Sequence, residues 1–174
     1  MMSEKNQIQL RAPRETDVAE IIRMQSDPGV FIGTDGRRFP ISEHDCKSWL
    51  TGANAGEYPT RVLYVIEADA RDVVGIVQLS GVNWIARQCW FGLWIGSEFQ
   101  NMGYGRISLQ VAISNASNYF GLRQLRLLVA ADNGRARSMY SDAGFIEEGV
   151  YVDYYSRNMT YCDAIAMRKD LRGE

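Results

Sequence analysis

Two glycines near the middle of the chain, Gly103 and Gly105, stand one residue apart in the stretch FQNMGYGRIS (99–108). An apolar run precedes them, and a segment with helical spacing of its apolar residues follows. Glycines allow a ligand to approach the backbone closely, and the start of a helix offers unpaired N–H groups and the positive end of the helix dipole. The spacing therefore predicts an anion site, with phosphate as the expected group.

Two other kinds of phosphate-binding loop have a similar glycine pattern. A dinucleotide site is nearly matched by Gly103-x-Gly105-x-x-Ser108 with Asp132 further on. Too few strands and helices follow the loop for a doubly wound fold, and a Walker loop is excluded because Gly-Lys-Ser/Thr is absent. An ordinary strand-to-helix turn stays open for the loop taken alone.

Helices and strands that must position the loop are predicted from the spacing of apolar residues, which recur about every 3.6 residues in a helix and every second residue in a strand. Helices are expected from a Thr16 cap to about Ser26, from a Ser42 cap through Leu50, after Gly105 to Phe120, and over 133–142. A Gly/Pro-rich loop joins the first two helices, and three adjacent strands after the second helix predict an antiparallel meander. The expected strands are 8–13, 61–68, 73–82, 87–96, 125–130, 147–155 and 161–169. This order predicts an α/β (α+β) fold with a mixed sheet, in which 125–130 runs parallel to 87–96.

Composition narrows the setting. The 174 residues are 46% hydrophobic, which suits a single domain spanning 1–174. A net charge of −2 without a basic stripe favours small-molecule or peptide partners over nucleic acid, and no apolar run suits a membrane. Three cysteines without a CxxC pair and a start without a signal peptide predict a cytoplasmic location. His44 lacks a ligand set around it, so no metal is expected.

Two motifs in a fixed order carry a family resemblance. QNMGYG (100–105) has the form Gln-x-x-Gly-x-Gly, and NGRARSMYSDAGF (133–145) has the form Asn-x-x-Ala-x-x-x-Tyr-x-x-x-Gly-Phe. A predicted helix and strand separate them. This pairing resembles the GNAT superfamily of acetyl-CoA-dependent N-acetyltransferases, and the opening IQLRAPRETD resembles its RimJ/RimL and spermidine acetyltransferase branch. The resemblance implies a mostly antiparallel central sheet, flanked by about four helices, with a parallel strand pair that splays at the CoA site.

The resemblance also implies which residues hold acetyl-CoA. The pyrophosphate would rest on the loop N–H groups and the pantetheine arm on the preceding strand, where one N–H would polarise the thioester carbonyl. Asn133 also fits a plain helix cap. The implied CoA-binding residues are Leu93, Trp94, Ile95, Gln100, Asn101, Met102, Gly103, Tyr104, Gly105, Arg106, Asn133 and Arg137.

Catalytic groups follow from the same resemblance. Tyr140 would be the general acid that protonates the departing thiolate, although a tyrosine on a helix also suits core packing. Family members often carry a Glu near the position of Trp90, and this sequence lacks it. Asp153, Asp35 and Glu98 stay open as acids near the site, so the base is unassigned.

The acceptor is a primary amine, by resemblance, held by the loop after the first helix and by the final hairpin. The implied contacts are Phe31, Asp35, Arg37 and Asp153. Arg37 and its neighbour Arg38 favour a substrate with a carboxylate, such as an amino acid or a peptide end. A polyamine acceptor and a non-catalytic acetyl-CoA sensor are the alternatives, and a homodimer is a further expectation.

Overall fold

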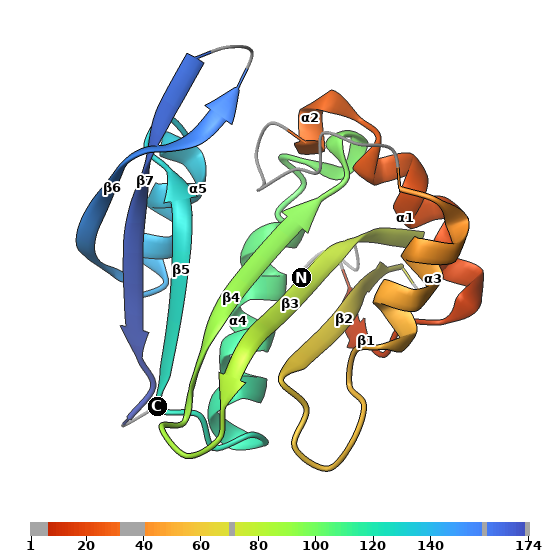
Figure 1. Ribbon diagram of the computed structural model, residues 1–174, viewed down its shortest axis with the longest axis horizontal. Helices are drawn as coiled ribbons and strands as arrows, with labels where there is room; N and C mark the ends of the chain where they lie inside the picture. The colour runs from red at the N-terminus through yellow and green to blue at the C-terminus, as the bar shows by residue number, and fades with distance from the viewer. Residues whose placement is uncertain (1–6, 32–40, 70–71, 158–159, 173–174) are drawn as a thin grey trace, which may run out of the picture.

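The computed structural model describes residues 7–31, 41–69, 72–157 and 160–172. Within these ranges, seven strands form one sheet in the order β1-β2-β3-β4-β5-β7-β6 (Figure 1). Every neighbouring pair is antiparallel except β4 and β5, which are parallel. The strands are β1 Ile8–Arg11, β2 Arg61–Ala68, β3 Asp72–Asn83, β4 Gln88–Ile95, β5 Gln124–Ala130, β6 Ile146–Arg157 and β7 Thr160–Asp170. The predicted mixed, mostly antiparallel sheet is confirmed.

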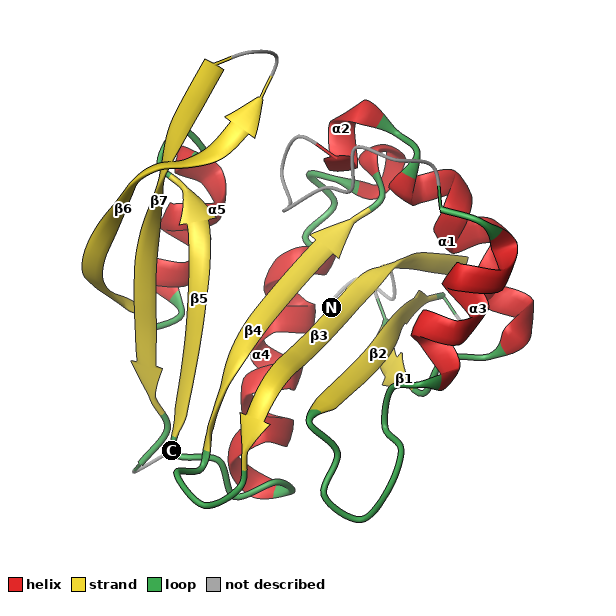
Figure 2. Cartoon of the chain, in the orientation of Figure 1, coloured by secondary structure: helices red, strands yellow, loops and turns green. Residues whose placement is uncertain are grey.

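Five α-helices and two 3-10 turns accompany the strands in the described ranges (Figure 2). They are α1 Val18–Gln25, α2 Pro28–Phe31, α3 Glu43–Thr51, α4 Tyr104–Asn118 and α5 Gly134–Asp142, with 3-10 turns at Glu15–Asp17 and Ser97–Phe99. The sequence predicted about four helices, and α2 is the addition. It lies in the stretch predicted to be a loop, where Pro28 stands at the first helical position, which suits its fixed φ.

Capping residues mark the start of α3 and the end of α4. Ser42 Oγ accepts a hydrogen bond from Asp45 N at 3.0 Å at the start of α3. After α4, Gly121 has φ +59°, and Leu122 N donates to Ala116 O at 2.9 Å. Such Gly-terminated ends satisfy carbonyls that the helix leaves unpaired. The predicted cap at Thr16 is wrong, because Thr16 lies inside the 3-10 turn and Asp17 holds the N-cap position of α1.

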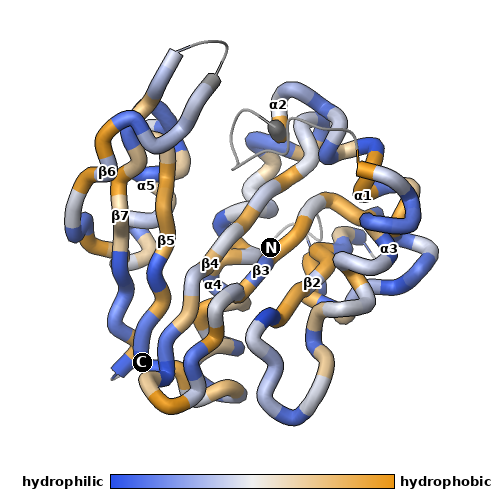
Figure 3. The backbone as a smooth tube through the Cα atoms, in the orientation of Figure 1, coloured by the Kyte–Doolittle hydropathy of each residue, from blue (hydrophilic) through white to orange (hydrophobic). Residues whose placement is uncertain are grey.

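Two hydrophobic cores lie on opposite faces of the sheet. Leu63 and Val65 of β2 pack with residues of α1 and α3, such as Ile21 and Leu50. The alternate β2 residues, such as Val62, pack into the other core with α4 and α5. Because side chains alternate along a strand, this period of two places α1 and α3 on one face and α4 and α5 on the other. Figure 3 shows the hydrophobic segments along the central strands.

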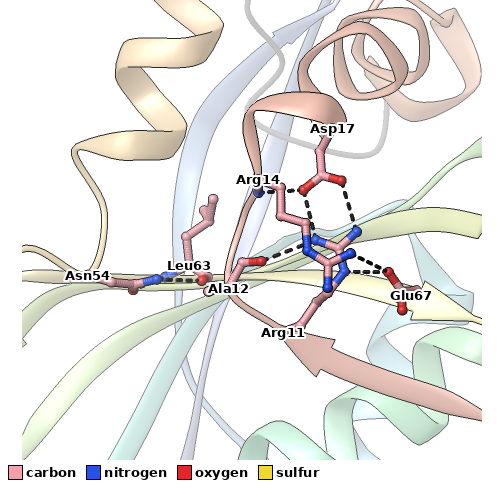
Figure 4. Close-up of polar contacts among 7 residues, drawn as sticks. All are labelled: Arg11, Ala12, Arg14, Asp17, Asn54, Leu63 and Glu67. Carbon is pink, nitrogen blue, oxygen red and sulfur yellow. Dashed lines mark hydrogen bonds and ion pairs between the residues drawn. The ribbon is translucent and has the colours of Figure 1, made fainter. Parts of the chain in front are cut away.

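A buried ion-pair cluster joins the start of the chain to β2 (Figure 4). The Arg11 guanidinium donates to both carboxylate oxygens of Asp17, at 2.8 and 2.9 Å, and also pairs with Glu67. The Arg14 backbone N–H donates to Asp17 at 2.7 Å. Burial opposes ionisation of Asp17, but the hydrogen bonds from Arg11 and Arg14 outweigh it and hold the pKa of this carboxyl below its usual value. The cluster fixes the turn that leads from β1 into α1.

Candidate active site

The parallel strands β4 and β5 separate part-way along their length (Figure 1). In the described sheet they pair only over 88–90 and 124–126, and the last pair joins Trp90 to Arg126. Beyond it, β4 pairs only with β3, as far as Ile95, and β5 pairs only with β7, as far as Ala130. The predicted splay of this strand pair is therefore confirmed.

A cavity of about 690 Å³ lies at this divergence. Its walls come from the end of β4, the loop that leads into α4, the first turn of α4, and α5, with two residues from α2. The lining residues are Gly29, Val30, Leu93, Trp94, Ile95, Phe99, Gln100, Asn101, Gly103, Tyr104, Gly105, Arg106, Asp132, Asn133, Arg135, Ala136, Ser138, Met139 and Tyr140. The two sequence motifs thus face each other across one cavity.

The backbone of β4 directs peptide groups into the cavity. The Gly96 N–H donates to Val74 O on β3 at 2.9 Å. Because peptide groups alternate in direction along a strand, those of Leu93 and Ile95 point the opposite way, toward β5. The Ile95 carbonyl indeed accepts a hydrogen bond from Gln100 Nε2 at 3.2 Å. Trp94 lines the cavity, but its own peptide group points toward β3.

The start of α4 closes one end of the cavity. Gly103 is the N-cap residue with φ +86°, and the Ile107 N–H is the first to bond back, to Gly103 O at 3.2 Å. The three N–H groups before it have no intrahelical acceptor, as at any helix start. A Cβ at Gly105 would lie 3.6 Å from the Met139 sulfur and 3.7 Å from the Ile95 side chain. A single Cβ fits there, whereas a longer side chain would occupy the cavity.

Tyr140 contributes a phenol to the opposite wall. Its ring is 7% exposed and packs against Phe91 and Phe145, with centroids 6.3 and 5.6 Å away. Burial raises the pKa of Tyr140, so the group stays protonated at neutral pH. Among the described residues, none hydrogen-bonds to its hydroxyl. The Tyr140 ring therefore packs in the core, while its hydroxyl remains available as a proton donor.

Comparison with known proteins identifies the family. A family model described as an acetyltransferase (GNAT) domain matches residues 7–146, which is most of the chain. The chain belongs to the GNAT acetyltransferase family.

Relatives and solved structures within this family are more specifically named. A spermidine N(1)-acetyltransferase of Vibrio cholerae is 31% identical over 104 residues, which cover 60% of this chain and 60% of that protein. The protein of the same name from Escherichia coli K12 is 29% identical over 60% of this chain and 55% of its own length. The matched region thus spans less than two thirds of either relative.

The fold similarity extends over nearly the whole chain. A crystal structure of spermidine N-acetyltransferase from Vibrio cholerae, in complex with CoA and spermine, superposes with a TM-score of 0.87 at 24% identity. The superposition covers 95% of this chain and 96% of that one. A chimera of the Vibrio cholerae enzyme superposes with a TM-score of 0.85 at the same identity and coverage of both chains. The GNAT fold is therefore shared from β1 through β7.

Most of the residues predicted to hold CoA line the cavity between β4 and β5. Ten of the twelve lie among the lining residues, and Met102 and Arg137 do not. Met102 is 50% exposed outside the lining. Arg137 donates instead to Ala131 O at 3.2 Å and to Glu147 at 2.7 Å.

The structure places Arg135, rather than Arg137, in the lining of the cavity. The sequence analysis missed Arg135, although helical spacing offered a signal. Residues 135, 136, 139 and 140 share one side of a helix that already carries Tyr140, and position 137 lies elsewhere on the helix.

Polar side chains at the cavity are mostly engaged with one another. Asn133 Oδ1 accepts from Ala136 N at 3.1 Å, so its predicted capping role is confirmed. Arg106 Nη2 lies 2.8 Å from an Asp142 carboxylate oxygen, which connects the first turn of α4 to the end of α5. This partner competes with an anionic ligand for the Arg106 charge.

The residues predicted on the acceptor side are only partly described. Asp35 and Arg37 lie outside the described residues, as do Arg38 and Phe39. Phe31 ends α2 directly after Val30, which lines the cavity. Asp153 lies at an irregularity of β6 with φ +53°, its N–H donating to Asp163 at 2.9 Å, and it is outside the lining.

A general base is not evident among the described lining residues, whose single carboxylate is Asp132. Trp90 pairs with Arg126 where β4 and β5 are still joined, and its side chain is 40% exposed. Glu98 forms an ion pair with Arg23 outside the lining. No cluster of His, Cys, Asp or Glu suitable for a metal ion occurs among the described residues. None of the described helices is long and apolar enough to cross a membrane.

Proposed function

We propose that this protein transfers an acetyl group from acetyl-CoA to a primary amine by direct attack in a ternary complex. The observation that carries the proposal is the splay of β4 and β5. It leaves peptide groups of Leu93 and Ile95 facing a cavity that ends at the first turn of α4 and is lined on the far side by Tyr140. Peptide groups without a strand partner, a helix start and a proton donor are what a thioester on a peptide-like, phosphorylated carrier requires.

The residues present fit acetyl-CoA, which supplies the acetyl group as an activated thioester. Leu93 and Ile95 would bind the amide groups of the pantetheine arm as a neighbouring strand would. The N–H groups of Tyr104, Gly105 and Arg106 would bind the pyrophosphate, with the 15-residue α4 aligning its dipole on it. Gln100, Asn101, Gly103 and Asn133 complete the proposed site, and Trp94 contributes its side chain.

Tyr140 holds the proton for the leaving sulfur. Its hydroxyl oxygen is free of described partners, so its proton is available to a thiolate that forms nearby. As the C–S bond of the tetrahedral intermediate breaks, charge builds on the sulfur and the phenolic proton moves to it, which yields the CoA thiol and leaves a phenolate on Tyr140; this is general acid catalysis of departure.

The acceptor amine is best tested first as a polyamine. Both named relatives are spermidine N(1)-acetyltransferases, and this supports the polyamine alternative. The competing hypothesis, an amino acid or peptide acceptor, rests on Arg37 and Arg38 in the stretch outside the described residues. An acceptor ammonium must lose its proton before attack, and we propose that it binds in the neutral form, since Asp132 is the single carboxylate among the described lining residues.

The wider setting is also proposed. We infer a single acetyltransferase domain over residues 1–174, a cytoplasmic location, and a homodimer. A dimer is supported by the edge strand β6, whose apolar side chains Val150 and Val152 are 56% and 74% exposed. An exposed apolar edge strand is a ready pairing surface.

The test of the proposed function is thiol release from acetyl-CoA with a panel of spermidine, spermine, amino acids, dipeptides and aminoglycosides. Thermal stabilisation by CoA is recorded on the same samples. Stabilisation with turnover of one amine class supports the enzyme and names its acceptor. Stabilisation without turnover across the panel favours the acetyl-CoA sensor, and no stabilisation refutes the CoA site.

A further inference from the structure

The two halves of the sheet are connected across the splay by a side chain that the function proposed above leaves unused. Arg135 extends from the first turn of α5, and its guanidinium donates to Gln100 Oε1 at 3.1 Å and to Asn101 Oδ1. Gln100 and Asn101 belong to the loop between β4 and α4. Arg135 therefore spans from the α5 side of the cavity to the loop on the β4 side.

Gln100 passes this connection on to β4. Its Nε2 donates to the Ile95 carbonyl at 3.2 Å, and its Oε1 accepts from Arg135. A guanidinium has only donors, so the bond from Arg135 determines which end of the Gln100 amide faces Ile95. Without Arg135 the amide is free to rotate, and the Ile95 carbonyl loses a fixed partner.

Asn101 gives Arg135 a second function. Its backbone has φ +64°, a conformation that non-glycine residues adopt at some cost. The bond from Arg135 to the Asn101 side chain holds the loop in this conformation. Gly103, the N-cap of α4, follows two residues later, so the position of the first helical turn depends on the same loop.

We propose that Arg135 is a positioning residue that presets the β4 edge for the pantetheine arm and the α4 start for the pyrophosphate, by holding Gln100 and Asn101 across the splay. The inference rests on the proposed CoA site and adds a residue to it. The planar guanidinium fork matches two amide oxygens, which a lysine ammonium cannot hold in the same geometry. Arg135 acts through Gln100 and the loop, not as a phosphate ligand.

The test compares two ligands that differ in phosphate. Dissociation constants for CoA and for pantetheine, which has no phosphate, are measured by NMR titration for wild type, Arg135→Gln, Arg135→Lys and Gln100→Glu. We expect Arg135→Gln to weaken pantetheine by about 5- to 20-fold, the scale of one charge-assisted hydrogen bond near the surface, and CoA by at least the same factor because CoA also uses the α4 start. Arg135→Lys should not restore binding. Arg168→Gln, which removes an arginine–carboxylate pair on β7, is the matched control and should leave both constants unchanged.

Gln100→Glu separates the two steps of the connection. The new carboxylate keeps the bond from Arg135 but places an acceptor against the Ile95 carbonyl, so both ligands should again weaken. In the double variant Arg135→Gln with Gln100→Glu, the loss should be smaller than the product of the single losses, because both changes break one connection.

Other results overturn the proposal. Weakening of CoA alone, or rescue by Arg135→Lys, identifies Arg135 as a direct phosphate ligand, and unchanged constants exclude any role. The side-chain amide signal of Gln100 in the free protein tests the connection without a ligand: it should shift in Arg135→Gln and not in Arg168→Gln. If wild type bound neither ligand, the proposed function would fail, while this amide signal would still decide whether Arg135 holds Gln100.

Discussion

Tyr140→Phe is the most direct test of the chemistry. Phenylalanine keeps the ring contacts with Phe91 and Phe145 and removes only the hydroxyl. That hydroxyl has no hydrogen-bond partner among the described residues, so its loss leaves no buried group unpaired. We expect the free energy of unfolding to change by less than about 1 kcal/mol.

The effect on turnover should be much larger than the effect on stability. Removing a general acid typically costs about 10²- to 10⁴-fold, and a thiolate is a better leaving group than most, so we expect kcat to fall by about 10- to 1000-fold. This corresponds to about 1.4 to 4 kcal/mol of transition-state stabilisation. The dissociation constant for CoA should stay within about 2-fold, because the proton is needed only as the thiolate forms.

The assay is thiol release under saturating acetyl-CoA and amine, with CoA binding measured calorimetrically on the same preparation. Tyr140→Ala is the packing control: it removes the ring and should lower both stability and turnover. An unchanged kcat in Tyr140→Phe would remove the assigned acid, and an equal loss of CoA affinity and kcat would show that the hydroxyl binds CoA instead.

Three further changes test other parts of the structure. Gly105→Glu should abolish CoA binding in a folded protein, measured by calorimetry, because it places bulk and negative charge at the start of α4 where the pyrophosphate is proposed; normal binding would refute the phosphate site. Asp17→Asn should lower the free energy of unfolding in urea by about 3 kcal/mol at pH 7, the scale for breaking a buried ion pair, whereas Asp170→Asn at an exposed pair should have no measurable effect. Because the folded pKa of Asp17 lies below its unfolded value of about 3.9, this difference should be present above that value and disappear as the pH falls through the folded pKa; a difference that persists at lower pH would contradict the ion-pair assignment. If the acceptor amine binds in its neutral form, as proposed, kcat/KM should rise about tenfold per pH unit up to about pH 9, and a plateau near neutral pH would reveal a base in the site.

Local sequence signals predicted the ends of the elements well. Ser42 acts within one turn of its own helix, so a short window contains the full physical cause. The strands of the meander were likewise found from their alternation and β-branched content, and β2 matches its predicted range of 61–68. The two motifs follow the adjacent strands β4 and β5, and the family resemblance that they carry placed them at one site.

Local signals could not predict ion pairs between residues far apart in sequence. Arg11 meets Glu67 from 56 residues away, and Arg106 meets Asp142 from 36, so no local pattern indicates either pair. Whether Arg135 or Arg137 lines the cavity depends on the orientation of α5 about its own axis. The packing of Tyr140 in the core sets that orientation.

The sequence by itself determined the family and supplied the proposals of a phosphate-binding loop and a proton donor, because each depends on residue types at short, fixed spacing. Only the tertiary structure decided where β4 and β5 part, which peptide groups face the cavity, and that Arg135 connects its two walls. The register of a strand pair and the rotation of a helix are set by the summed packing of residues distant in sequence, and that sum exists only in the folded chain.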